Sequence, residues 1–158
     1  MLLVISFVVY AQPKKYIGGD ISLLPSYEEK GAVYRDFDGK PVEPLAFFRK
    51  MGWNAMRVRL FVNPEFAPQE HKDEGVCQDL KYALALSKRV KDAGFDLLLD
   101  IHYSDYWADP SKQTIPHLWK NVKPESLEDS VYAYTTRVLR SFRAKGVVPD
   151  MIQVGNEI

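Results

Sequence analysis

The chain repeats one pattern along its length: an amphipathic helical segment, a glycine that ends it, and a short apolar segment. The first helix is predicted to begin near Pro44, because proline suits the opening turn of a helix, and to end at Gly52. Residues 55–60 form a predicted apolar strand after it, and residues 16–19 form an earlier one. This alternation of helices and strands predicts a parallel α/β fold.

Two further units continue the pattern. A helix is predicted over residues 78–93, where apolar residues recur at helical spacing, before a strand over residues 97–101. That strand is too apolar to be half exposed, so we expect a sheet covered on both faces. The next helix is predicted to begin at the capping-box pattern of residues 126–129 and to end at Gly146, before a strand over residues 151–154. Its inward residues are predicted to be Val131, Val138 and Phe142.

Two fold classes use such an alternation. A doubly wound nucleotide-binding sheet requires a glycine-rich phosphate loop after the first strand, and residues 18–22 lack the spacing of that loop. The other class, the (β/α)8 TIM barrel, typically needs about 250 residues. Four strands in 158 residues correspond to half of a barrel. We therefore predict that residues 12–158 are the N-terminal half of a TIM-barrel catalytic domain, truncated after the fourth strand.

The charge balance limits the classes of binding partner that the chain is expected to have. The 21 basic and 21 acidic residues cancel, so the chain lacks the basic surface expected of a protein that binds nucleic acid or an anionic membrane. We predict no nucleic-acid partner, and a neutral ligand fits this balance better.

The N-terminus carries an apolar run from Leu2 to Tyr10, and small residues, Val9 and Ala11, precede Gln12 at the positions that signal peptidase recognises. The run is far shorter than the roughly 20 residues of a membrane span. We predict a signal peptide at residues 1–11 that lacks its basic beginning, and a secreted or periplasmic protein with no membrane span. The alternative is a buried strand.

In a TIM barrel the chemistry lies at the carboxyl ends of the strands. Glu157 follows the fourth strand directly, where a carboxyl group is partly desolvated and its pKa raised, as a general acid near neutral pH requires. Asn156 beside it can hydrogen-bond a sugar hydroxyl. The alternative is an ordinary glutamate at a strand end.

The second predicted strand carries Arg57 and Arg59, two residues apart, so both side chains are expected on the same side, toward the barrel interior. One of them could orient a catalytic carboxylate. Otherwise the two arginines face solvent at the strand end. Asp20 ends the first strand.

The loop after the third strand mixes aromatic and polar residues. Flat apolar faces suit the C–H side of a pyranose ring, and polar groups fix its orientation. The aromatic residues are Tyr103, Tyr106 and Trp107, and the polar ones are His102, Ser104, Asp105 and Asp109. Ordinary packing is the alternative for the aromatic residues. A metal site made by His102, Asp105, Asp109 and His117 is conceivable, but the spacing of these residues matches no familiar ligand signature, so we predict no metal and no cofactor.

These motifs resemble those of glycoside hydrolase family 53 from Tyr16 to Ile158. They are Gly18-Gly19-Asp20-Ile21-Ser22, the run from Met56 to Pro64, the run from Asp100 to Pro110, and Gly155-Asn156-Glu157-Ile158. The resemblance implies an endo-β-1,4-galactanase that cleaves galactan and arabinogalactan side chains of pectin. From their types and places at the strand ends, the predicted substrate-binding residues are Asp20, Arg57, Arg59, His102, Asp105, Tyr106, Trp107 and Asn156.

The resemblance also implies a retaining mechanism, in which Glu157 first protonates the glycosidic oxygen and then activates water. The family's nucleophile is on the seventh strand, and a calcium site of some members also belongs to the second half of the barrel, so we expect the present polypeptide to be inactive alone. Two alternatives stay open: another retaining barrel glycosidase, such as a mannanase or cellulase, and a non-catalytic carbohydrate-binding half-barrel.

Overall fold

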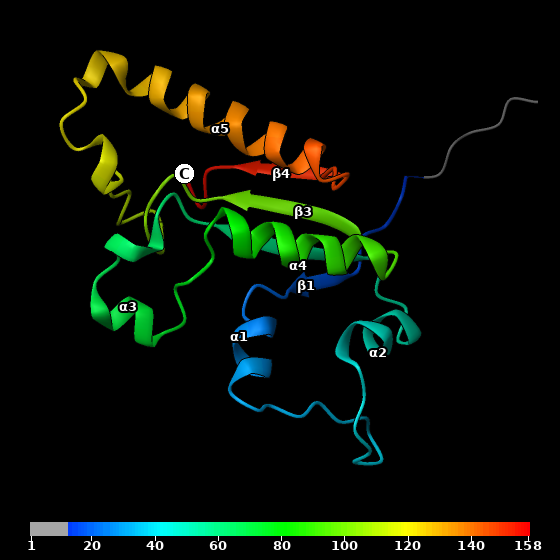
Figure 1. The fold of residues 1–158 in the computed structure, drawn as a ribbon. Helices are drawn as coiled ribbons and strands as arrows, with labels where there is room; N and C mark the ends of the chain where they lie inside the picture. Colours follow the sequence, from blue (N-terminus) through cyan, green and yellow to red (C-terminus); the bar gives the residue numbers. More distant parts are fainter. Residues whose placement is uncertain (1–12) are drawn as a thin grey trace, which may run out of the picture.

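The computed structural model describes residues 13–158, so the signal peptide predicted at residues 1–11 lies outside the described residues. Four strands form one parallel sheet in the order of the sequence: β1 (Gly18–Asp20), β2 (Ala55–Leu60), β3 (Asp96–Ile101) and β4 (Met151–Val154). Helices separate successive strands, as Figure 1 shows. This sequential parallel order is that of the first four strands of a TIM barrel, which confirms the predicted fold class.

Five α-helices are present in the described residues: α1 (Leu24–Glu29), α2 (Pro44–Lys50), α3 (Gln69–Asp73), α4 (Leu80–Asp92) and α5 (Leu127–Ala144). Short 3-10 turns lie at Pro64–Phe66, His117–Trp119 and Pro124–Ser126. The predicted helices correspond to α2, α4 and α5. Helices α1 and α3 could not be predicted from the sequence, because with only six and five residues they show too little periodicity.

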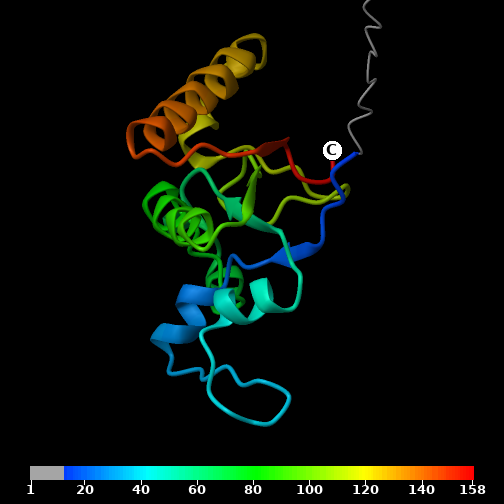
Figure 2. The ribbon, with the colours of Figure 1, turned by 90° about the vertical axis from the view of Figure 1, so that its right-hand side faces the viewer.

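The two faces of the sheet differ in character. Met56, Val58 and Leu60 of β2 are buried in the hydrophobic core with Leu97, Leu99 and Ile101 of β3, against α4 and α5. Figure 2 shows α4 and α5 on the same side of the sheet. Because side chains alternate along a strand, the opposite face carries Arg57, Arg59 and Asp100.

The expected covering of both faces is therefore wrong for residues 13–158. Helices pack against the outer face, and the inner face, which is the interior side of a barrel, carries the polar residues. Leu98 of β3, on that inner face, is only partly buried. The outer face also stays incomplete at β4, where Ile152 and Val154 are exposed.

The capping box predicted at residues 126–129 is not formed. Ser126 has φ −108° and ψ 2° and makes no side-chain capping hydrogen bond, because it ends the turn Pro124–Ser126 and lacks the extended backbone of a capping residue. On α5, Val138 and Phe142 are buried as predicted, whereas Val131 is only partly buried and Tyr134 joins the core instead. Within residues 13–158, every helix is too short or too polar to cross a membrane.

Candidate functional site

Side chains from all four strands meet on the inner face of the sheet, at the carboxyl ends. Arg57 of β2 is at the centre: its Nη2 donates to the carboxylate of Asp100 on β3 and, over 2.6 Å, to Oδ1 of Asn156 after β4. Its Nε lies 3.8 Å from Oδ2 of Asp20 on β1. One guanidinium group therefore connects residues from four strands.

Asp20 joins the two arginines. Its Oδ2 accepts a 2.6 Å hydrogen bond from Nε of Arg59, and its Oδ1 accepts one of 2.9 Å from the backbone N–H of Ser22. Burial opposes ionisation of Asp20, but the Arg59 guanidinium and the Ser22 N–H outweigh it and hold the pKa of Asp20 below its ordinary value. Because both arginines contact Asp20, the predicted placement of Arg57 and Arg59 on one side is confirmed.

Arg59 also has an aromatic neighbour. Its guanidinium lies 4.6 Å from the ring centroid of Trp107, and the rings of Trp107 and Phe61 make a T-shaped contact with centroids 5.1 Å apart. A guanidinium over an indole face is a favourable cation–π contact. One face of Trp107 is therefore occupied by protein.

His102 is buried beneath this surface. Its Nδ1 accepts a 3.1 Å hydrogen bond from the backbone N–H of Ala108, so Nδ1 carries no proton. That Nε2 lies 3.2 Å from Oδ2 of Asp100. The ring therefore fixes the start of the loop after β3 and faces the buried carboxylate.

The chain turns sharply at the end of β4. Gly155 has φ 87° and Glu157 has φ 50°, and a left-handed backbone is uncommon for a residue other than glycine. Such strain is concentrated at functional sites. The side chain of Glu157 is exposed. The partial burial predicted for it is therefore not found, because no part of residues 13–158 covers it.

These side chains surround a cavity of about 290 Å³. It is lined by Arg57, Arg59, His102, Trp107, Ala108, Asp109, Asn156 and Glu157. Asp20 borders it through its contacts with both arginines. Most of the residues singled out in the sequence are thus brought together at one place, with cationic, amide, carboxyl and aromatic groups facing one hollow.

Two of the predicted residues are placed elsewhere. The carboxylate of Asp105 accepts from the backbone N–H of Asn63 at 3.0 Å and of His117 at 2.7 Å, so both its oxygens join loops. The ring of Tyr106 stacks on His71, with centroids 4.6 Å apart. Both residues consolidate the loops after β2 and β3, outside the cavity.

The structure does not bring His102, Asp105, Asp109 and His117 together as a metal site. Among residues 13–158, no group of three or more His, Cys, Asp and Glu side chains has an arrangement that could hold a metal ion. Asp105 and His102 are engaged by backbone N–H groups as described.

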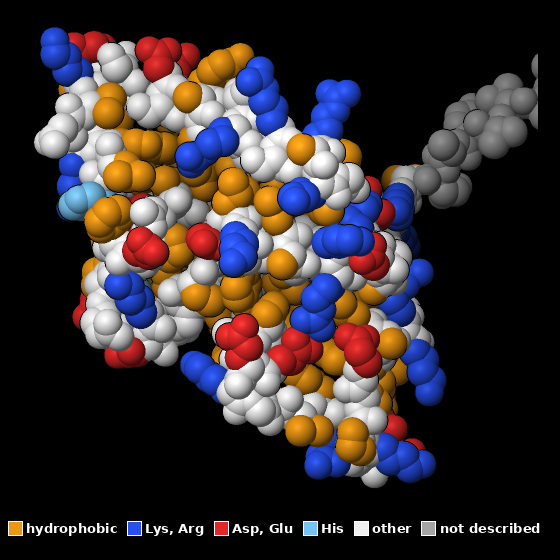
Figure 3. Space-filling view, in the orientation of Figure 1, with side chains coloured by type: hydrophobic (Ala, Val, Ile, Leu, Met, Phe, Trp, Pro, Cys, Tyr) orange, Lys and Arg blue, Asp and Glu red, His pale blue; other side chains and the backbone are white. Residues whose placement is uncertain are grey.

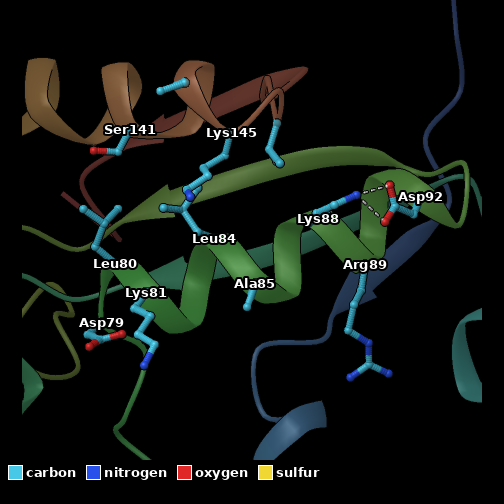
Figure 4. A pocket seen from close by; sticks show the side chains of 12 residues that line it. Asp79, Leu80, Lys81, Leu84, Ala85, Lys88, Arg89, Asp92, Ser141 and Lys145 are labelled. Carbon is cyan, nitrogen blue, oxygen red and sulfur yellow. Dashed lines mark hydrogen bonds and ion pairs between the residues drawn. The ribbon is translucent and has the colours of Figure 1, made fainter.

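A larger cavity, of about 990 Å³, lies between α4 and α5 on the outer face of the sheet. Figure 4 shows aliphatic side chains such as Leu80 and Leu84 along it and the Lys88–Asp92 ion pair at its edge. Figure 3 shows hydrophobic side chains gathered between these helices, with lysines and arginines around them. The larger cavity has no aromatic lining and lies away from the carboxyl ends of the strands, so we assign the functional site to the smaller cavity.

Two side chains of this site were not predicted. Asp100 is fully buried beside Arg57, and Gln153 donates a 3.2 Å hydrogen bond to Oδ1 of Asn156. A polar residue at an inward position of an otherwise apolar strand is the signal that could have found both.

The chain is similar to known proteins over most of its length. Residues 16–158 match the family model described as "Glycosyl hydrolase family 53". An arabinogalactan endo-β-1,4-galactanase of Cellvibrio japonicus is 40% identical over 143 residues, which are 90% of this chain and 36% of that protein. An endo-β-1,4-galactanase of Bacillus subtilis is 34% identical over 140 residues, which are 89% of this chain and 32% of that protein.

The fold of the chain is also similar to solved structures. A structure of fungal β-1,4-galactanases superposes with a TM-score of 0.79 at 33% identity, over 90% of this chain and 40% of that one. The GH53 catalytic domain of Ignisphaera aggregans also gives 0.79, at 34% identity, over 89% of this chain and 39% of that one. The chain thus spans less than half the length of the proteins that it matches.

Proposed function

Because this chain belongs to glycosyl hydrolase family 53, we propose that the full-length protein is an endo-acting glycosidase. Its proposed substrates are the β-1,4-linked galactan and arabinogalactan side chains of pectin. Relatives that carry the name arabinogalactan endo-β-1,4-galactanase support this substrate.

The observation that carries the proposal is the position of Glu157. It borders the cavity at the carboxyl end of β4, next to Asn156, which Arg57 holds with a 2.6 Å hydrogen bond. In this proposal Glu157 is the proton donor to the glycosidic oxygen. It then acts as the base that activates water in a retaining reaction.

A retaining reaction requires a second carboxylate about 5 Å from the acid. Asp20 and Asp100, the inner-face carboxylates at these strand ends, are both ion-paired with arginine, and Asp100 is fully buried. Both carboxylates are taken up by contacts with the arginines, and neither lines the cavity directly. Asp109, which also lines the cavity, accepts hydrogen bonds from the backbone N–H and the hydroxyl of Ser111 through Oδ1. We therefore propose that the nucleophile is supplied by a part of the full-length protein outside residues 13–158.

The remaining residues of the cavity have proposed binding roles. Trp107 offers an apolar surface to the C–H face of a galactose ring, and Arg59 and Asn156 offer hydrogen bonds. Asp20 keeps Arg59 in place. Asp105 and Tyr106 are proposed to act indirectly, by shaping the loop that carries Trp107.

The test is to express the full-length protein and to measure reducing ends released from β-1,4-galactan, cellulose and mannan. We expect release from galactan only. Release from mannan or cellulose instead would show that the substrate is wrong, and release from none of them would refute the proposed activity.

We also propose that the protein is exported to the periplasm or the medium. The apolar run of residues 2–10 with small residues before Gln12 supports this. The test is N-terminal sequencing of the protein recovered outside the cytoplasm, where a start at Gln12 is expected. A cytoplasmic protein that retains residues 1–11 would contradict the proposal.

A further inference from the structure

The proposed mechanism assigns no role to the carboxylate of Asp100. It lies on the inner face of β3, and its side chain has no exposed surface. Its Oδ2 accepts from Arg57, whereas its Oδ1 has no hydrogen-bond partner among the described residues. An ionised carboxylate in such a place is costly unless a cation holds it, so its presence calls for a specific role.

The contacts around Asp100 form a ring, which is closed by the proximity of His102 to Asp100 rather than by a hydrogen bond. Asp100 accepts from Arg57, Arg57 donates to Oδ1 of Asn156, and Nδ2 of Asn156 donates to the carbonyl oxygen of Ala108 over 2.5 Å. The N–H of Ala108 donates to Nδ1 of His102, whose Nε2 lies 3.2 Å from Asp100. The ring joins β2, β3 and the turn after β4.

The ring fixes the orientation of the Asn156 amide. Its oxygen faces a cationic donor and its nitrogen faces a carbonyl oxygen, so exchanging the two would break both hydrogen bonds. The backbone oxygen of Asn156 also accepts from Nε2 of Gln113 at 3.1 Å. Glu157 follows directly with its left-handed backbone.

We propose that Asp100 is a positioning residue, whose charge holds Arg57 and thereby sets Asn156 and the turn that carries Glu157. Arg57 has two anionic neighbours, and without Asp100 it would be drawn toward Asp20, 3.8 Å from its Nε, and away from Asn156. The catalytic consequence of this inference rests on the proposed function, but the coupling of Asp100 to Asn156 does not.

The first experiment therefore needs no substrate. We would compare the side-chain amide signals of Asn156 by NMR in the wild-type chain and in Asp100→Asn, which keeps the shape of the side chain and removes its charge. The matched control is Asp96→Asn, because Asp96 is on the same strand and face but pairs with Lys14 at the opposite end. We expect hydrogen exchange of the Asn156 amide to accelerate at least about tenfold in Asp100→Asn, since the hydrogen bonds that protect it are lost. The control should leave it unchanged, and equal effects of the two variants would overturn the inference.

A measurement on the wild-type chain keeps the test decisive if Asp100→Asn does not fold. The guanidinium protons of Arg57, held by Asp100 and Asn156, should exchange at least about tenfold more slowly than those of Arg140, which is exposed. Equal exchange rates would show that Asp100 does not hold Arg57.

The second experiment uses the full-length protein. A displacement of about 1 Å near the reacting groups can cost roughly a hundredfold in rate, so kcat of Asp100→Asn should fall about tenfold to hundredfold with little change in KM. Asp100→Glu should recover part of the loss because it restores the charge. An unchanged kcat would overturn the positioning role. If no glycan is cleaved by the wild type, the proposed function fails, while the NMR result still decides whether Asp100 is coupled to Asn156.

Discussion

Arg57 donates a 2.6 Å hydrogen bond to Oδ1 of Asn156, which is 99 residues further along the chain. The same Nη2 atom binds the carboxylate of Asp100. Because Asn156 directly precedes Glu157, this one contact ties the candidate proton donor to the second and third strands.

Arg57→Lys should lower the activity of the full-length protein on galactan by about a hundredfold, because lysine lacks the guanidinium whose Nη2 binds Asp100 and Asn156 while its Nε lies beside Asp20. Initial rates with β-1,4-galactan measure this. Arg140→Lys, at an exposed position of α5, is the control and should retain the wild-type rate. A wild-type rate in Arg57→Lys would show that the bridge is dispensable.

Glu157→Gln should reduce turnover by about 10² to 10⁴-fold, because the amide cannot donate the proton that the leaving group needs. The side chain is exposed, so the folded state should be as stable as the wild type, which thermal unfolding would check. Glu125→Gln, also exposed, serves as the control. Full activity of Glu157→Gln would remove Glu157 from the mechanism.

Asp105→Ala should destabilise the chain by about 3 kcal/mol, because it leaves two backbone N–H groups, of Asn63 and His117, without their carboxylate partner. Urea unfolding would measure the free energy. Asp38→Ala, at an exposed turn, should change it by less than about 0.5 kcal/mol. A similarly small effect of Asp105→Ala would mean that the loops do not depend on this residue.

Acid should destabilise the fold partly through Asp20. Burial raises the pKa of Asp20, but the contacts with Arg59 and Ser22 outweigh burial and hold it below the ordinary value of 3.8 in the folded state. The unfolded chain therefore binds the proton more readily. The stabilisation is complete above that ordinary value and is lost as the pH falls through the lowered folded-state pKa. Asp20→Asn should therefore show a shallower loss of stability on acidification, measured by urea unfolding at a series of pH values from about 6 to 3. Asp38→Asn should keep the wild-type slope, and an identical slope in Asp20→Asn would contradict the assignment.

The sequence was a reliable guide where a pattern repeats. The apolar residues of α4 and the strands β2, β3 and β4 lie where helical spacing and apolar runs predicted them, because those patterns follow directly from which side chains must leave water. Short helices such as α3, and the failed cap at Ser126, depend on neighbouring loops and were missed or misplaced.

The candidate site was predicted in its members but not in its contacts. Glu157, Asn156 and Arg57 could be identified because strand ends of a barrel converge, and the alternation along β2 gave the common side of Arg57 and Arg59. The separation of Asp105 and Tyr106 from the cavity could not be predicted, because it results from hydrogen bonds and stacking with residues of other loops.

The sequence by itself determined the order of strands and helices, the family resemblance and the polar ends of the strands, since each of these depends on residues that are near in the chain. Only the tertiary structure decided that Asp100 is buried against Arg57, that Arg57 holds Asn156, and that Glu157 is exposed within residues 13–158. Such contacts join residues far apart in sequence, and their geometry follows from the packing of the whole sheet rather than from any local pattern.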